Sequence, residues 1–255
     1  MLIDTHAHLD DPRFKQDRDV VIRRAFAAGI EAIVNVGTDL STSRASVTLS
    51  EQYDRVYAAV GCHPHDADTL SPDGLSQLAE LTRGDKVVAI GETGLDFYRD
   101  RSPRDVQRWA FCDQIRLART CRLPLIVHSR SADEETMRIL HVEGAAEVGG
   151  VLHCFPGDMD LARRAIRMNF HIGLGGTTTF KNSSSLTVAR QIPLEWMLLE
   201  TDCPYLAPMP HRGKRNEPAY VRFAAQRIAS ERGISLDTLA EATGENARRL
   251  FGLDW

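Results

Sequence analysis

Two histidines stand near the start of the chain, in the segment LIDTHAHLD, separated by a single alanine. The residues before them are strand-like, and side chains two positions apart on a strand point to the same face. We therefore expect His6 and His8 to share a face. Histidine is the commonest metal ligand in proteins, so this pair is a candidate part of a metal site.

Four more apolar runs end in a side chain that can bind a metal. VVAIGE ends in Glu92, PLIVH in His128, GGVLH in His153 and MLLETD in Asp202. The carboxyl ends of parallel barrel strands meet at one mouth, where the active sites of such barrels lie. Four histidines and two carboxylates exceed the needs of one tetrahedral ion, whereas two divalent cations that share a carboxylate use them all. The predicted metal ligands are His6, His8, Glu92, His128, His153 and Asp202.

The elements that position these side chains alternate between two types. Short apolar runs, typical of buried parallel strands, lie at 2–3, 32–36, 56–62, 87–90, 124–127, 151–152, 170–174 and 197–199. Helical spacing or capping residues mark segments between and after them, at 17–28, 103–122, 217–232 and 236–250. The pattern predicts an α/β fold, a (β/α)8 TIM-type barrel that forms a single domain over residues 1–255. A doubly wound open sheet is the alternative, but no GxGxxG follows the first strand.

The spacing of the candidate ligands agrees with a barrel. Glu92 and His128 lie 36 positions apart, and His128 and His153 lie 25 apart, each about one strand–helix–strand repeat. The gaps from His8 to Glu92 and from His153 to Asp202 leave room for the intervening strands. If these residues had only structural roles, their position at one end of five strands would be a coincidence.

Composition limits the classes of partner. The chain has 255 residues, 43% hydrophobic and 26% charged, with a formal net charge of −4, so nothing global attracts nucleic acid or an anionic membrane. An anionic substrate must be held by local charges. No apolar run reaches membrane-spanning length, and the start does not read as a signal peptide. Five cysteines without a CxxC pair fit a reducing compartment, so we predict a cytoplasmic location.

Seven motifs, taken in order, make the chain resemble one family. DTHAHLD, GCHPH, GETGLDFYRD, IVHSR, LHCFPG, ETDCPYLAP and RNEPAY are similar to the successive motifs of the TatD family of metal-dependent deoxyribonucleases, which lies within the amidohydrolase-type barrels. The similarity runs from residue 3 to ENARRLF near the end. It implies a distorted (β/α)8 barrel, a divalent-metal site and nuclease activity, and it places the family's ligands on the six residues named above.

The resemblance also implies a mechanism. Glu92 would bridge two divalent cations (Zn, Mn, Co or Mg), which would activate a water. Asp202 would hold one ion, orient that water and accept its proton, so Asp202 and Glu92 are the predicted catalytic residues. Glu200 stands two positions before Asp202, where it either supports the ligands or is a carboxylate of the barrel interior.

Loops at the predicted mouth supply candidate substrate contacts. The resemblance makes His63, which follows the third strand, a contact to phosphate or a support for a ligand. Arg130 follows a predicted ligand by two positions and either binds an anionic oxygen or forms a surface ion pair. The segment HRGKRNEP after strand eight carries Arg212, Lys214 and Arg215, which either receive a phosphodiester backbone or are solvated surface.

The sequence positions of three further residues indicate what roles to expect for them. Phe97 and Tyr98 follow Glu92 in what we expect to be a loop, where one of them stacks a base or both pack against the protein. His171, within the seventh strand, is expected to be structural.

Three functions of different classes remain open on the sequence. The first is hydrolysis of a phosphodiester in nucleic acid, with single-stranded DNA as the expected substrate and no obligatory protein partner. The second is amidohydrolase-type hydrolysis of a small cyclic amide, ester or lactone. Many related barrels bridge their metals with a carboxylated lysine at the strand-four position, where this chain has Glu92. The third is a non-catalytic scaffold, although structural metal sites are usually closed and rich in cysteine.

Overall fold

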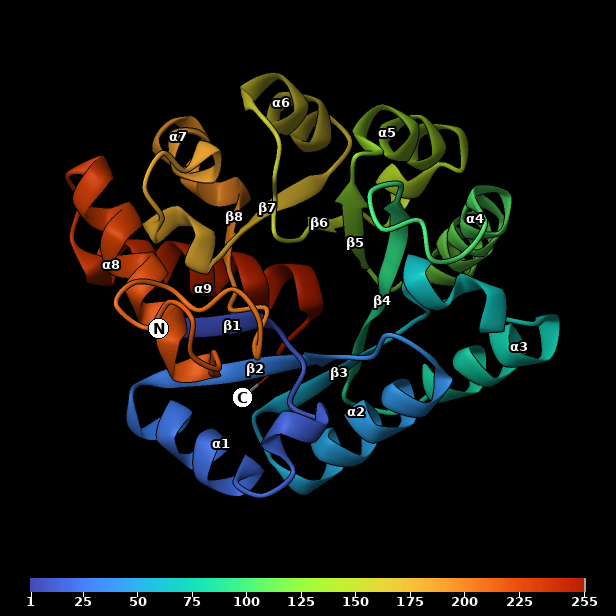
Figure 1. Ribbon diagram of the computed structural model, residues 1–255, viewed down its shortest axis with the longest axis horizontal. Coiled ribbons are helices and arrows are strands. Elements are labelled where there is room, and N and C mark those ends of the chain that lie inside the picture. Colours follow the sequence, from blue (N-terminus) through green and yellow to red (C-terminus); the bar gives the residue numbers. More distant parts are fainter. Residues whose placement is uncertain (255) are drawn as a thin grey trace.

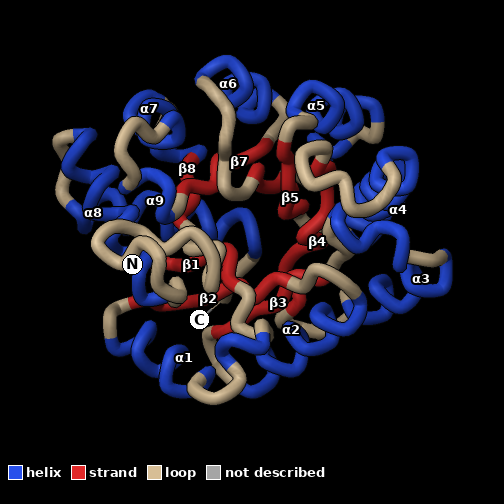
Figure 2. Tube along the Cα trace, viewed as in Figure 1, coloured by secondary structure: helices blue, strands red, loops and turns tan. Residues whose placement is uncertain are grey.

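The apolar runs of the sequence form eight parallel strands that pair in chain order, from β1 to β8, and enclose a barrel. Figure 1 shows a computed structural model of the chain, in which residues 1–254 are described. Figure 2 shows the strands as an inner ring with helices outside it. The strands are β1 (Leu2–Ala7), β2 (Ile30–Val36), β3 (Val56–Val60), β4 (Val87–Asp96), β5 (Leu125–Arg130), β6 (Gly150–Leu152), β7 (Phe170–Leu174) and β8 (Met197–Leu199).

The barrel closes between its first and last strands through a few contacts at their carboxyl ends. The Asp202 N–H donates to the carbonyl of His6 at 2.8 Å, and the His8 N–H donates to the carbonyl of Cys203 at 2.8 Å. The Thr5 hydroxyl adds a bond to the Leu199 carbonyl at 3.0 Å. Closure therefore takes place beside the predicted metal ligands.

Helices follow the strands and cover the barrel from outside (Figure 2). Several begin at a serine whose hydroxyl accepts a backbone N–H: Ser71, Ser183 and Ser235. The helices are α1 (Arg18–Ala27), α2 (Leu40–Gln52), α3 (Pro72–Leu81), α4 (Arg104–Cys121), α5 (Asp133–Val142), α6 (Met159–Arg167), α7 (Ser184–Gln191), α8 (Val221–Arg232) and α9 (Leu236–Phe251). No helix in residues 1–254 combines the length and the apolar character needed to cross a membrane.

The core has two parts. The larger one joins strands to the surrounding helices, as in the contact set around Phe111, Ile115 and Phe170. The smaller one contains inward-facing strand residues, such as Val34 and Leu198, with Ala247 and Phe251 of α9. Helix α9 therefore closes the end of the barrel opposite the mouth, and the mouth alone stays open for chemistry.

The predicted alternation is confirmed, with three differences in detail. Strand β1 extends from the predicted 2–3 to Ala7, so His6 lies within a strand. Strand β4 continues to Asp96, so Glu92 lies within the strand. The loop expected directly after Glu92 begins only after Asp96, and the prediction is wrong for the residues between them. Register shifts next to both positions mark irregularities that aim the two side chains at the mouth. The predicted helix at 217–232 begins with a 3-10 turn, and α8 starts only at Val221.

Candidate metal centre

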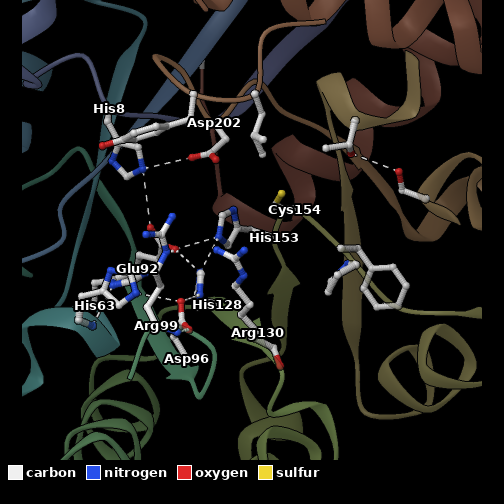
Figure 3. A pocket seen from close by; sticks show the side chains of 18 of the residues that line it. His8, His63, Glu92, Asp96, Arg99, His128, Arg130, His153, Cys154 and Asp202 are labelled. Carbon is white, nitrogen blue, oxygen red and sulfur yellow. Dashed lines mark hydrogen bonds and ion pairs between the residues drawn. The ribbon is translucent and has the colours of Figure 1, made fainter. Parts of the chain in front are cut away.

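The predicted metal ligands come from five strands or the residues that follow them, and the structure brings all six together at the mouth. His6, Glu92 and His128 lie within β1, β4 and β5, whereas His8, His153 and Asp202 directly follow β1 and β6 or come shortly after β8. Figure 3 shows five of these side chains, all except that of His6, around a single space. They are buried or nearly so, and they face each other rather than the apolar core.

The first group of ligand atoms combines residues from near the start of the chain with Glu92 and Asp202. His6 Nε2 and His8 Nε2 lie 3.1 Å apart. Glu92 Oε2 is 3.4 Å from His6 Nε2 and 3.7 Å from His8 Nε2. Asp202 Oδ1 lies 3.9 Å and 3.5 Å from the same two nitrogens. Two imidazoles and two carboxylates therefore face one point.

The second group surrounds the other oxygen of Glu92. Glu92 Oε1 lies 2.8 Å from His153 Nε2, 3.0 Å from His128 Nδ1 and 3.4 Å from His63 Nε2. One carboxylate thus reaches both groups, one oxygen to each. His63, predicted as a substrate contact, lies within the range of a ligand.

The donor set fits a divalent cation. In each of three overlapping groups, three nitrogen and oxygen ligand atoms lie within 4.8 Å of one another: His6, His8 and Glu92; His6, His153 and Asp202; His63, Glu92 and His128. No lysine or arginine in residues 1–254 forms an ion pair with the carboxylate of Glu92 or Asp202. Imidazole nitrogens with carboxylate oxygens, at a mouth open to solvent, are the ligands of catalytic metal sites.

A network outside the centre orients His8 and His128. His8 Nδ1 lies 2.8 Å from the carbonyl of Val36, and His128 Nε2 lies 3.2 Å from Asp96 Oδ2. Asp96 is fixed in turn, because its other oxygen accepts the N–H groups of Tyr98 and Arg99. Such outer contacts set the ring orientation of metal-ligating histidines. The sequence predicted no role for Asp96, because this residue was expected in a loop, whereas the structure places it at the end of β4.

Glu200 is buried behind His153, where it holds the backbone of the next residue. Its Oε1 accepts the N–H of Cys154 and lies 3.9 Å from His153 Nδ1, while Oε2 has no hydrogen-bond partner in the described residues. A Cβ on Gly173 would lie 2.5 Å from that Oε2 atom, so only glycine leaves room for the carboxyl. Burial raises the pKa of Glu200 to about 7.

A second buried carboxyl holds the backbone beside Asp202. Asp4, with no exposed surface, accepts the N–H and the hydroxyl of Thr201 at 2.8 and 2.6 Å. The Asn216 amide donates to the Thr201 carbonyl at 2.8 Å. Asp202 itself has φ of 57°, a left-handed conformation that aspartate tolerates better than most residues. Its position is therefore fixed from both sides.

The carboxylates of the centre stay ionised although they are buried. Burial raises the pKa of Glu92, but the surrounding histidines outweigh it and hold the pKa well below its usual range. Burial also raises the pKa of Asp202, and the hydrogen bond to His8 outweighs it, so this pKa is lowered as well. For His8, burial lowers the pKa, but Asp202 and Glu92 raise it to about 9. Burial also lowers the pKa of His128, but Asp96 and Glu92 raise it to about 9, so charged histidines balance the two carboxylates where a bound cation would take their place.

A cavity of about 860 Å³ opens above the centre. Four cationic side chains line it, two of them on one side after β4, and none of the four has a carboxylate partner within residues 1–254: Arg99, Arg101, Arg130 and Lys181. The structure thus brings the predicted contact Arg130 to the cavity, where its guanidinium lies 4.0 Å from the ring centre of Tyr98. The sequence did not predict a role for Arg99, Arg101 or Lys181, although the motif GETGLDFYRD contains Arg99.

The arginines of the basic segment after strand eight have different surroundings in the structure. Arg212 is exposed and stacks on Phe180, a cavity-lining ring 4.5 Å away. Arg215 binds Asp17 through two hydrogen bonds, at 2.6 and 2.8 Å, and covers the ring of Phe14. Of the two alternatives for Arg215, this pairing favours the surface ion pair over a phosphate contact.

The two aromatic residues after β4 also differ from each other. Phe97 packs beneath Arg104 and Arg108, with its ring centre 4.5 and 5.3 Å from their guanidinium carbons. Tyr98 is 62% exposed beside Arg130. Of this pair, Tyr98 alone stays available for stacking.

A (β/α)8 barrel with carboxylates and imidazoles grouped at its open mouth defines a metal-dependent hydrolase. The chain belongs to the TatD related DNase family, whose model matches residues 3–252. The family assignment drawn from the seven motifs is thereby confirmed.

Similar proteins cover the full length. The chain is 46% identical over 255 residues, all of both chains, to a protein of Bacillus subtilis (strain 168) named uncharacterized metal-dependent hydrolase YabD. It is 36% identical, with 99% of each chain covered, to a protein of Enterobacter lignolyticus named 3'-5' ssDNA/RNA exonuclease TatD. The solved structure of YJJV, a TatD homolog from Escherichia coli K12, superposes with a TM-score of 0.94 at 33% identity and covers 99% of this chain and 98% of its own.

Proposed function

We propose that this hydrolase cleaves phosphodiester bonds in single-stranded nucleic acid, as a 3'-5' exonuclease that uses two divalent metal ions. The observation that carries the proposal is the set of unpaired cations beside a centre of carboxylates and imidazoles. Such a combination suits a substrate whose phosphates need both a metal-binding pocket and separate positive charges. Single-stranded DNA is the expected substrate, and a cytoplasmic location stays a prediction.

The unpaired cations contrast with the rest of the surface. Elsewhere, arginines form ion pairs across neighbouring helices, as Arg108 does with Glu135 and Arg116 with Glu143. Around the cavity, Arg99, Arg101 and Arg130 have no such partner in the described residues. A chain with net charge −4 that leaves cations free at its mouth has a local binding site for phosphate, independent of its global charge.

Each proposed ligand has a defined place in the centre. One ion would be held by His6, His8 and Asp202, and a second by His128 and His153, with Glu92 contributing one oxygen to each. When bound, the ions supply Lewis acidity to the phosphate and lower the pKa of a water molecule. Four imidazoles favour Zn, Mn or Co over Mg for affinity.

The residues of the chain then divide the remaining tasks. Asp202 would align the attacking water and accept its proton, which its lowered pKa and its contact with the first group of ligand atoms support. Arg130 and Arg212 hold phosphates of the strand on either side of the reacting one. His63 faces the reacting phosphate from the second group.

The decisive experiment compares two substrate classes. End-labelled single strands of DNA and RNA are incubated with metal-free protein reloaded with Mn²⁺, Zn²⁺, Co²⁺ or Mg²⁺, beside a panel of lactones and cyclic amides. We expect stepwise shortening from the 3' end with at least one metal, and loss of all activity in a chelator. Turnover of a lactone or amide without cleavage of either nucleic acid would replace the proposal with the amidohydrolase alternative.

A further inference from the structure

For three histidines around the centre, His8, His63 and His128, a hydrogen bond to the outer ring nitrogen determines whether that nitrogen carries a proton. A neutral imidazole has one N–H donor and one nitrogen with a lone pair, and only the latter can bind a metal. The partner of the nitrogen that faces away from the centre therefore decides what the other nitrogen offers. A carbonyl or carboxylate there requires a proton on the outer nitrogen, whereas an N–H group there excludes one.

His8 and His128 have the arrangement of a ligand. His8 Nδ1 meets the Val36 carbonyl at 2.8 Å, so Nδ1 carries a proton and Nε2 is the nitrogen that can offer its lone pair to a metal ion at the centre. His128 Nε2 meets Asp96 Oδ2 at 3.2 Å, so the proton lies on Nε2 and Nδ1 faces Glu92. In both rings an acceptor stands behind the imidazole.

His63 has the opposite arrangement. The backbone N–H of His65 donates to His63 Nδ1 at 3.0 Å. Because an N–H group only donates, Nδ1 has the lone pair and the neutral ring carries its proton on Nε2. That Nε2 points to the centre, 3.4 Å from Glu92 Oε1. A protonated nitrogen has no lone pair for a metal ion.

The backbone fixes this arrangement. His63 directly precedes the 3-10 turn Pro64–Thr69, and this places the His65 N–H against its ring. The His63 N–H donates to the Thr38 carbonyl at 2.8 Å, which anchors the residue. Its ring meets those of His65 and His128 edge-on, at 4.4 and 4.5 Å between centroids, and is 8% exposed.

We propose that His63 is not a metal ligand but a neutral hydrogen-bond donor, whose Nε2–H contacts the phosphoryl oxygen of the substrate beside Glu92. The contact to substrate rests on the proposed function, whereas the tautomer and the absence of metal binding do not. His63 would stabilise the negative charge that develops on that oxygen, because its donor is already in place before the reaction. It is a catalytic residue in this sense, and the His65 N–H is what keeps it a donor.

Two measurements without substrate test the tautomer. Long-range proton–nitrogen correlation spectra of protein with ¹⁵N-labelled histidine distinguish Nδ1–H from Nε2–H rings, and assignment uses the spectrum of His63→Gln. Metal content after loading and gel filtration is compared in His63→Gln and in His8→Gln, a matched loss of one imidazole. We expect an Nε2–H signal for His63 with and without metal, unchanged metal content in His63→Gln and reduced content in His8→Gln. A metal-shifted His63 signal, or equal metal loss in both variants, would overturn the proposal.

Kinetics test the donor role. His63→Ala should lower kcat on an end-labelled single strand by about 10² to 10³-fold, the typical effect of removing one such donor. His63→Gln keeps an N–H donor and should recover part of that loss at the same metal content. Equal rates for wild type and His63→Ala would refute the donor role. If no nucleic acid is cleaved at all, the proposed function fails, while the spectra and metal content still decide the tautomer.

Discussion

The two ends of the barrel each bury a histidine, and the two rings differ in their neighbours. At the mouth, His8 has a carbonyl on one nitrogen and the metal-binding group on the other. Towards the closed end, His171 of β7 pairs in register with Val151, an inward-facing residue of the smaller core. Neither nitrogen of His171 has a hydrogen-bond partner in residues 1–254, and its ring lies 5.0 Å from that of Trp196.

Electrostatics separates the same two rings. Burial lowers the pKa of His171 to about 4, and the opposing effect comes from the backbone of Gly150 and not from a carboxylate. For His8, burial also lowers the pKa, but Asp202 and Glu92 outweigh it. Burial and residue type therefore do not identify a functional histidine. The acceptors behind the ring and the carboxylates in front of it do.

The largest expected effect comes from removing the shared carboxylate at the mouth. Glu92→Gln keeps the side-chain volume but loses the charge that both groups of nitrogens surround. We expect at least one metal ion to be lost and the rate to fall by several orders of magnitude, as measured by metal analysis and single-turnover cleavage.

Glu134→Gln is the matched control, because Glu134 is an exposed carboxylate on α5 that pairs with Arg164. Its metal content and rate should equal those of the wild type. Full metal content with near-native turnover in Glu92→Gln would assign Glu92 to a structural role.

Asp202→Asn separates ligand from base. The amide oxygen still ligates weakly but cannot accept a proton at neutral pH. We expect some metal to remain while kcat falls by about 10² to 10⁴-fold, the range of general-base catalysis. The measurement is kcat against pH at saturating Mn²⁺. Wild-type turnover with an unaltered pH profile would remove Asp202 from the chemistry.

Neutralising cavity cations should have a smaller effect, confined to charged substrates. Arg99→Gln combined with Arg130→Gln should raise KM for a single strand and reduce the salt slope by about 1.4, since each phosphate contact contributes about 0.7. Arg163→Gln combined with Arg222→Gln removes the same charge from the exposed outer surface, away from the cavity lining. An equal change of slope in both doubles would show that net charge alone acts.

The smallest effect concerns the closed end. Because the pKa of His171 falls from 6.5 to about 4 on folding, the unfolded chain binds an extra proton between these pH values. The free energy of unfolding therefore falls as the pH drops from about 6.5 to 4. The contribution of the neutral His171 ring is fully present above pH 6.5. His171→Gln should show a weaker loss of unfolding free energy than the wild type over that window in urea titrations. Parallel curves for the two proteins would contradict the unpartnered, neutral state of His171.

The sequence predicted the barrel and the convergence of six ligand candidates because both follow from short-range patterns. Apolar runs mark strands, and a histidine or carboxylate near their ends marks the mouth. What the pattern could not show is contact between distant segments. Asp4 and Asp96 act through bonds to Thr201 and to His128, residues far along the chain or on another strand. The pairing of Arg215 with Asp17, which the basic segment alone does not reveal, is of the same kind.

Closure of the barrel between β1 and β8 connects the metal centre with the progress of translation. Synthesis delivers His6 and His8 first, and Asp202 only after all eight strands have been made. Until then β1 has no neighbour on one side, because its partners are the backbone groups of Asp202 and Cys203. A chain that stops before β8 therefore has five of the six ligands and an open barrel edge. A complete set of ligands can assemble only in a chain translated beyond Asp202, so a chain truncated before β8 cannot form the first group of ligand atoms in full.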